Sequence, residues 1–154
     1  DISMILSLTG TEPNYVNAVG QSYLGSGIAD TTITHLSFPS GIRAHVYVSW
    51  LHPFKEQKLV VIGDQGMAVF DDTQDWGEKL LLYPHTVKLE GEVSIAQRAD
   101  ARAIVVEPRE PLREECKHFV NCVMHGIPPR TVAEEGLRVL RVLTAAQQSL
   151  TDAL

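Results

Sequence analysis

Alternating apolar and polar residues in the first two thirds of the chain indicate β-strands. The alternation is clearest over residues 42–50, where one face carries Ile42, Ala44, Val46, Val48 and Trp50 and the other carries Arg43, His45, Tyr47 and Ser49. We expect the first of these faces to be core. We predict further strands at residues 15–24, 29–38, 59–62, 67–70, 79–83 and 101–107. The predicted turns are Gly25-Ser26-Gly27, Pro39-Ser40-Gly41 and Gly63-Asp64-Gln65-Gly66. Residues 84–100 are weakly patterned, and we expect a long loop or an irregular edge there.

Helical spacing of apolar residues marks both ends of the chain. Ile2, Ile5 and Leu6 predict a helix that stops at Gly10, and we expect the chain to begin inside that helix. A second helix is predicted from Pro111 to Gly126. Its expected core stripe consists of Leu112, Cys116, Phe119, Val120 and Val123. A third helix begins near Thr131, and its apolar face consists of Leu140, Val142, Leu143, Ala146 and Leu150.

Strands followed by helices predict an α+β fold, with an open, mainly antiparallel sheet and helices packed on one of its faces. The length of 154 residues suits a single domain over residues 1–154. The other sheet face would carry His45 and Tyr47, where a solvated sheet usually carries Lys, Glu or Thr. We therefore expect that face to meet a partner subunit or a substrate.

Composition narrows the possible partners and the compartment. The formal net charge is −6 and no basic run is present, which disfavours nucleic acid. No apolar run reaches the roughly 20 residues that cross a bilayer, and no signal-peptide pattern opens the chain. Cys116 and Cys122 point in different directions on one predicted helix, so a disulfide between them is disfavoured. Free thiols fit a reducing cytoplasm.

Several short motifs, in this order, resemble the C-terminal half of Gfo/Idh/MocA oxidoreductases. They are Asp1-Ile2-Ser3-Met4-Ile5-Leu6, Phe38-Pro39-Ser40-Gly41 leading to Ser49-Trp50, and Lys58-Leu59-Val60-Val61-Ile62-Gly63 with Gly66. The tail adds Glu110-Pro111-Leu112, His118-Phe119-Val120, Pro128-Pro129 and Glu135-Gly136-Leu137-Arg138-Val139-Leu140. Residues 49–58 are most similar to the nucleotide-sugar dehydrogenases of that family.

The resemblance implies an open mixed sheet, as in the C-terminal domain of dihydrodipicolinate reductase, that follows an N-terminal Rossmann domain absent from this chain. It also implies homo-oligomers built through the open sheet face, leaving dimer and tetramer open. The implied reaction is hydride transfer between NAD or NADP and a sugar or nucleotide sugar. The family's Gly-rich cofactor loop and Glu-Lys-Pro lysine would lie outside the chain, and only Asp1 of its catalytic His-Asp pair would remain. We therefore expect no cofactor-binding or catalytic residue here, and a chain that is inactive alone.

Trp50, His52 and Lys55 are the candidate substrate-binding residues, because they lie where a strong strand ends at Pro53. Lys55 could offer a cation to a phosphate or carboxylate, and His52 a hydrogen bond or a proton. The alternative places Trp50 in the core and leaves His52 and Lys55 in a solvated turn.

Two possible metal sites are disfavoured by their spacing. His118, Cys122 and His125 share a helical face, but no accompanying metal-binding motif is present and that face should be surface. Asp71, Asp72 and Asp75 lack the alternation of a calcium loop and are expected to form a solvated acidic turn. We predict no metal.

Two functional hypotheses follow. The first is the substrate and oligomerisation domain of an NAD(P)-dependent oxidoreductase. The second is a stand-alone oligomerisation or ligand-binding module without catalysis.

Overall fold

The computed structural model describes residues 1–25 and 27–152, and the chain divides into two compact units. Unit 1 consists of Asp1–His52 and Glu115–Leu154, and unit 2 consists of Pro53–Glu114. Ser26, in the predicted Gly25-Ser26-Gly27 loop, lies outside the described residues.

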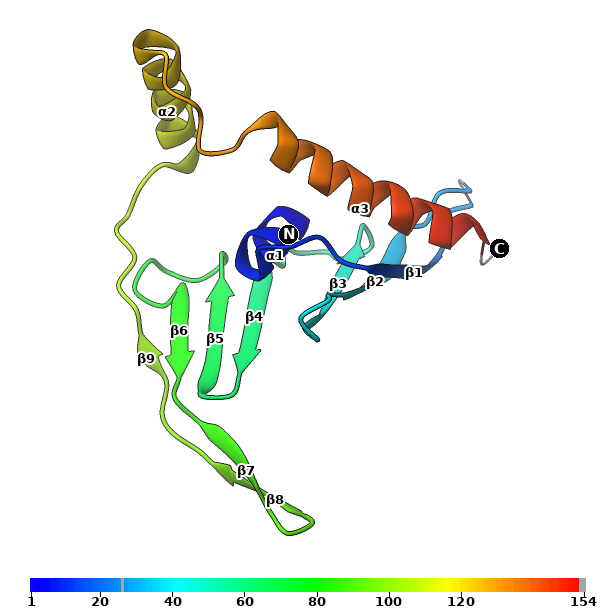
Figure 1. Cartoon of the computed structure of the whole chain (residues 1–154), viewed down its shortest axis with the longest axis vertical. Coiled ribbons are helices and arrows are strands. Elements are labelled where there is room, and N and C mark those ends of the chain that lie inside the picture. The colour runs from blue at the N-terminus through cyan, green and yellow to red at the C-terminus, as the bar shows by residue number, and fades with distance from the viewer. Residues whose placement is uncertain (26, 153–154) are drawn as a thin grey trace. The chain divides into compact units, whose positions relative to one another are not determined.

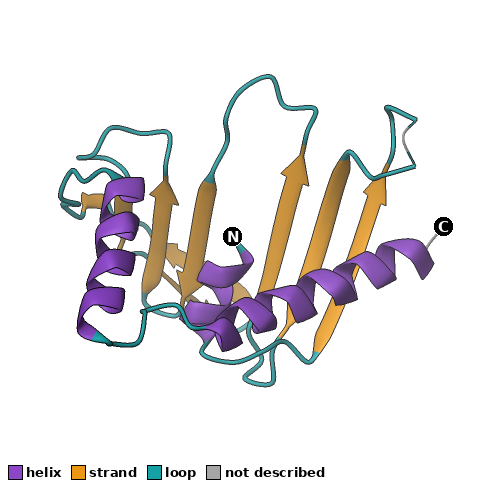
Figure 2. Cartoon of the chain, turned by 90° about the horizontal axis from the view of Figure 1, so that it is seen from above, coloured by secondary structure: helices purple, strands orange, loops and turns teal. Residues whose placement is uncertain are grey.

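Unit 1 contains a three-stranded antiparallel sheet with helices α1 and α3 (Figure 1). The strands β1 (Tyr15–Gln21), β2 (Thr31–Ser37) and β3 (Arg43–Ser49) pair in that order. Helix α1 (Ile2–Thr9) ends at Gly10, whose φ of 68° turns the chain out of the helix while its N–H bonds to the Leu6 carbonyl. Helix α3 (Ala133–Asp152) runs across one face of this sheet (Figure 2).

Alternation and register give the unit 1 sheet an inner and an outer face. The inner face carries Val16, Ala18, Thr34, Leu36, Ala44 and Val46. Leu36 is fully buried there, in a core that also includes Leu6 of α1 and Val142 of α3. The outer face carries Tyr15, Asn17, Val19, Ile33, His35, His45 and Tyr47. Helices α1 and α3 thus cover the inner face, while most outer-face side chains stay exposed.

Helix α3 also closes the free edge of β1. The Ser149 hydroxyl accepts hydrogen bonds from the Ala18 N–H at 3.0 Å and from Asn17 Nδ2 at 3.1 Å. Arg141 of the same helix binds Glu12 at 2.9 Å. Because a strand edge with unpaired N–H groups invites pairing with other chains, these contacts protect β1.

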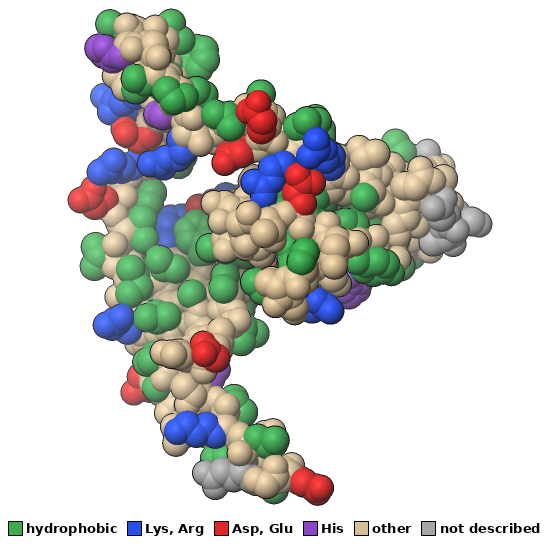
Figure 3. All heavy atoms as spheres, in the orientation of Figure 1, with side chains coloured by type: hydrophobic (Ala, Val, Ile, Leu, Met, Phe, Trp, Pro, Cys, Tyr) green, Lys and Arg blue, Asp and Glu red, His purple; other side chains and the backbone are tan. Residues whose placement is uncertain are grey.

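Unit 2 contains a four-stranded antiparallel sheet in the order β4 (Lys58–Gly63), β5 (Gly66–Asp71), β6 (Leu80–Tyr83) and β9 (Arg102–Ala103). The predicted turn joins β4 to β5, with Gly63 opposite Gly66. A separate hairpin consists of β7 (Thr86–Glu90) and β8 (Val93–Gln97). Hydrophobic side chains gather over β4–β6 (Figure 3). Val60, Val61 and Ile62 of β4 are exposed.

The structure confirms the predicted α+β class, with open antiparallel sheets and, in unit 1, α1 and α3 on one sheet face. Two strand predictions are wrong. Residues 84–100 contain the regular β7–β8 hairpin where a long loop or an irregular edge was expected. The strand expected at residues 101–107 shrinks to Arg102–Ala103, because only Leu81 and Leu82 of β6 pair with it.

Two predicted sets of core residues are also wrong. In the predicted stripe of helix α2 (Pro111–His125), Leu112, Phe119 and Val123 are at least 65% exposed. The helix instead buries Cys122. The segment that follows the helix folds back over this side of it and brings the Pro128 carbonyl to the Cys122 thiol. In and beside β3, Ile42, Val48 and Trp50 lie at the strand ends and are exposed.

No helix among residues 1–25 and 27–152 is both long enough and apolar enough to cross a membrane.

Candidate functional site

The outer face of unit 1 is a partly apolar surface on which β1, β2 and β3 place no carboxylate. Strand register places Val19, Ile33 and Tyr47 in one row across the three strands. These side chains are exposed by 50%, 40% and 54%. Strands β1, β2 and β3 contain no Lys, Asp or Glu, and Arg43 is the only charged residue among them.

The next row of the outer face holds a contact between two imidazoles. His35 of β2 and His45 of β3 are direct cross-strand partners. Their Nδ1 atoms lie 2.6 Å apart, and the rings meet edge to face. Because both atoms belong to imidazoles, one Nδ1 must donate a hydrogen and the other must accept it. Farther along β3, the Tyr47 hydroxyl lies 3.3 Å from His52 Nε2.

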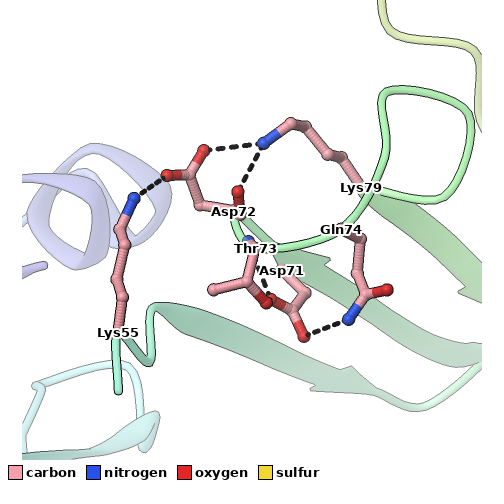
Figure 4. A network of polar contacts seen from close by, with 6 residues as sticks. All are labelled: Lys55, Asp71, Asp72, Thr73, Gln74 and Lys79. Atoms are coloured by element: carbon pink, nitrogen blue, oxygen red, sulfur yellow. Dashed lines mark hydrogen bonds and ion pairs between the residues drawn. The ribbon is translucent and has the colours of Figure 1, made fainter. Parts of the chain in front are cut away.

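In unit 2, two lysines bind one carboxylate (Figure 4), which we call the lysine–aspartate network of Lys55, Asp72 and Lys79. Lys55 Nζ donates to Asp72 Oδ2 at 2.6 Å, whereas Lys79 Nζ donates to Oδ1 at 2.9 Å and to the Asp72 carbonyl at 2.5 Å. The Lys79 side chain is 11% exposed and lies over the Trp76 ring, while that of Lys55 is 64% exposed. The nearly buried ammonium group of Lys79 thus fixes the Asp72 carboxylate. That carboxylate in turn holds the exposed ammonium group of Lys55.

Hydrogen bonds set the charge state of the two neighbouring aspartates. Those from Lys55 and Lys79 lower the pKa of Asp72 below its ordinary value. Those from the Thr73 side chain and backbone lower the pKa of Asp71 strongly, and Lys58 lies 3.3 Å from that carboxylate. Both carboxylates are therefore anionic at neutral pH and face lysines.

Part of the chain matches a known protein family. Residues 1–69 match the family model described as the GFO/IDH/MocA C-terminal domain. The N-terminal part of the chain is therefore similar to a Gfo/Idh/MocA C-terminal domain. None of the curated proteins matches the chain in sequence.

Solved structures share the fold of the chain over almost its whole length. A protein from Magnetospirillum magnetotacticum described as an oxidoreductase is 30% identical, with a TM-score of 0.75 over 95% of this chain and 45% of its own. UDP-N-acetylglucosamine 3-dehydrogenase GnnA from Acidithiobacillus ferrooxidans is 20% identical, with a TM-score of 0.77 over 97% of this chain and 46% of its own. Aldose-aldose oxidoreductase from Caulobacter crescentus is 21% identical, with a TM-score of 0.73 over 99% of this chain and 43% of its own. The chain thus spans about half the length of these proteins.

The three substrate-binding candidates lie in different surroundings. Trp50 and His52 follow β3 in unit 1, and Lys55 precedes β4 in unit 2. Trp50 is 79% exposed, so its interpretation as a core residue is wrong. His52 contacts Tyr47, and Lys55 belongs to the lysine–aspartate network.

The described residues hold no group of three or more His, Cys, Asp or Glu side chains arranged for a metal ion. His118 Nε2 accepts a hydrogen bond from the Arg130 N–H at 2.9 Å and lies 3.6 Å from the buried Cys122 thiol. His118 and His125 are exposed as expected, whereas Cys122, also expected at the surface, is buried. His118 and Cys122 both contact the segment after α2. Asp71 and Asp72, expected in a solvated acidic turn, are bound by lysines instead.

The described residues do not form a dinucleotide site of the Rossmann type. A dinucleotide site of the Rossmann type needs parallel strands joined through a helix, whose N-terminus meets the pyrophosphate. Every strand pair in the described part of the chain is antiparallel.

Two features of the site escaped the sequence interpretation. His35 could have been found, because a hairpin turn centred on Ser40 places His35 opposite His45. The ion pair between Asp72 and Lys79 depends on the conformation of the segment between β5 and β6. The spacing of residues in the sequence does not predict that conformation.

Proposed function

We propose that this chain is the substrate and oligomerisation domain of an NAD(P)-dependent oxidoreductase that acts on a sugar or nucleotide sugar. The partly apolar, carboxylate-free outer face carries the proposal, together with the similarity of residues 1–69 to a family of C-terminal domains. The names of two similar structures, a UDP-N-acetylglucosamine dehydrogenase and an aldose-aldose oxidoreductase, support the substrate class.

The cofactor and the catalytic groups belong, in this proposal, to an N-terminal Rossmann domain outside the chain. The antiparallel pairing of the described strands supports that division, because it supplies no dinucleotide site. Asp1 would be the one member of the family's His-Asp pair present, and the chain alone would be inactive. Either NAD or NADP is compatible with the domain. The free thiols of Cys116 and Cys122 support a cytoplasmic location.

Trp50, His52 and Lys55 are the proposed substrate contacts. Lys55 is the best supported, because Asp72 holds its ammonium group at 2.6 Å while most of the side chain remains open to solvent. An ammonium group has three N–H donors, so two can still bind the phosphate of a nucleotide sugar. Trp50 would offer an exposed aromatic surface to the substrate, and His52 a hydrogen bond.

A second copy of the chain is the proposed occupant of the outer face. The formal net charge of −6 makes two copies repel each other, and β1–β3 form a surface without any carboxylate. Exposed Tyr15, Val19, Ile33 and Tyr47 supply apolar area that a symmetric contact would bury twice.

Replacing Ile33 with Lys tests the subunit contact. The variant would place a charge in the middle strand of the outer face, where burial without a partner is costly. We expect light scattering after size-exclusion chromatography to show oligomers for the wild type and monomers for Ile33→Lys. Val105→Lys is the matched control, because Val105 is exposed by 86% and lies in unit 2. A wild-type monomer at high concentration would contradict this part of the proposal.

The enzymatic part is tested on the intact protein. The coding sequence upstream of the chain should specify a Gly-x-Gly-x-x-Gly fingerprint and a Glu-Lys-Pro, and the protein should reduce NAD or NADP with one of a panel of nucleotide sugars. Lys55→Ala should raise KM for the phosphate-bearing substrate more than it changes kcat. If no such segment precedes the chain, the stand-alone oligomerisation or ligand-binding module is correct.

A further inference from the structure

Two imidazoles share one hydrogen in the centre of the outer face. His35 lies on the middle strand β2, and the His35–His45 pair is flanked by Asn17 of β1 in the same row. We propose that the His35–His45 pair makes self-association through the outer face depend on pH, with acid separating the subunits. The inference rests on the proposed association of two copies through this face.

The geometry of the pair accommodates one hydrogen between the rings. At a separation of 2.6 Å, one Nδ1 donates and the other accepts. When both rings are protonated, both Nδ1 atoms carry hydrogen and neither can accept. The contact must then open, and two positive charges stand side by side on neighbouring strands.

No carboxylate on the surrounding strands can compensate these charges. The titratable or charged groups on the same face beside the pair are Tyr15, Arg43, Tyr47 and His52. Of these, Arg43 is itself a cation, and it donates to the carbonyls of Gly41 and Ile42. Helices α1 and α3 pack on the inner face, so their side chains do not face the pair.

Association of two copies would further raise the free-energy cost of protonating both imidazoles. In the free chain both rings are exposed, and water solvates their charge. A second copy seated on the outer face would remove that water, and burial disfavours the charged form of an imidazole. In a two-fold contact each copy brings its own pair, so the cost arises twice. Because imidazole changes charge between about pH 5 and 8, the associated state is favoured at the alkaline end of that range.

The test measures the dissociation constant of the chain by analytical ultracentrifugation at about pH 8 and about pH 5.5, the range in which imidazole titrates. EDTA is present throughout to exclude bridging by metal ions. By linkage, each proton taken up on dissociation raises the dissociation constant by up to about tenfold per pH unit. We expect an increase of about tenfold or more for the wild type on acidification.

Three variants assign the effect to the pair. His35→Asn with His45→Asn keeps polar groups at both positions and removes the titration, so its association should not change with pH. The single variant His45→Asn removes the paired imidazole and should lose most of the pH dependence, which covers the case of a double variant that fails to fold. His125→Asn is the matched control, because His125 is exposed on α2, and it should behave as the wild type.

The outcomes separate this inference from the association itself. Equal association of the wild type at both pH values overturns the inference and leaves the subunit contact standing. An unchanged pH dependence in a folded variant of the pair also overturns it. A wild type that is monomeric at every pH contradicts both the contact and the inference. Circular dichroism at both pH values excludes acid unfolding as the cause of any dissociation.

Discussion

Lys79 and Lys55 bind the same Asp72 carboxylate, but their side chains differ greatly in solvent exposure. The Lys79 side chain is 11% exposed and that of Lys55 is 64% exposed. We predict that Lys79→Ala lowers the free energy of unfolding by roughly 2–4 kcal/mol, because it removes a nearly buried partner and its packed methylene stem. Lys55→Ala, the matched control, should cost less than about 1 kcal/mol, as exposed ion pairs do. Urea unfolding checks both values, and equal losses would contradict the burial argument.

Asp72 should also make stability depend on pH in the acid range. Its pKa is lowered in the folded chain by hydrogen bonds from Lys55 and Lys79, so the unfolded chain takes up a proton first as pH falls. The stabilisation is therefore complete above the ordinary carboxyl pKa of about 4 and is lost below it. We expect the urea midpoint to fall less between pH 6 and pH 3 (about the range of carboxyl titration) in Asp72→Asn than in the wild type. Asp75→Asn is the control, and a wild-type slope in Asp72→Asn would contradict the prediction.

At the scale of elements, Gly66 shows why one position in unit 2 requires glycine. A Cβ placed there would lie 2.7 Å from the Tyr83 carbonyl oxygen of β6. We predict that Gly66→Ala destabilises the chain by about 1–3 kcal/mol, because β5 and β6 must move apart. Gly77→Ala is the matched control, since nothing lies within 4 Å of its Cβ position. Thermal unfolding of both variants checks the difference, and equal melting temperatures would contradict it.

The sequence predicted those elements whose pattern and packing agree. The alternation in residues 42–50 predicted β3, and His45 and Tyr47 lie on the exposed face as expected. The hairpin of β7 and β8 also had a signal, because Val87, Leu89, Val93 and Ile95 alternate on both sides of Gly91-Glu92, a two-residue turn with glycine first. That signal was missed.

Burial was harder to predict than the elements themselves. The spacing of Leu112, Phe119 and Val123 identified α2 as amphipathic, but an apolar stripe does not say whether another part of the chain covers it. In the same way, Lys55 was a candidate from its position, while its partner Asp72 depends on the fold of unit 2. Side-chain partners brought together by loops leave no periodic trace in a sequence.

At the scale of the whole molecule, the chain corresponds to about half the length of similar solved proteins, and its described strand pairs are all antiparallel. We therefore predict that neither NAD nor NADP shifts the melting temperature of the chain alone. A bound cofactor at one hundred times its Kd would stabilise the fold by about 2.7 kcal/mol, which a thermal-shift assay detects readily. The proposed full-length oxidoreductase, with its Rossmann domain, is the positive control and should shift. A clear shift of the chain alone would place the cofactor site among these residues and contradict the proposed division of labour between the two domains.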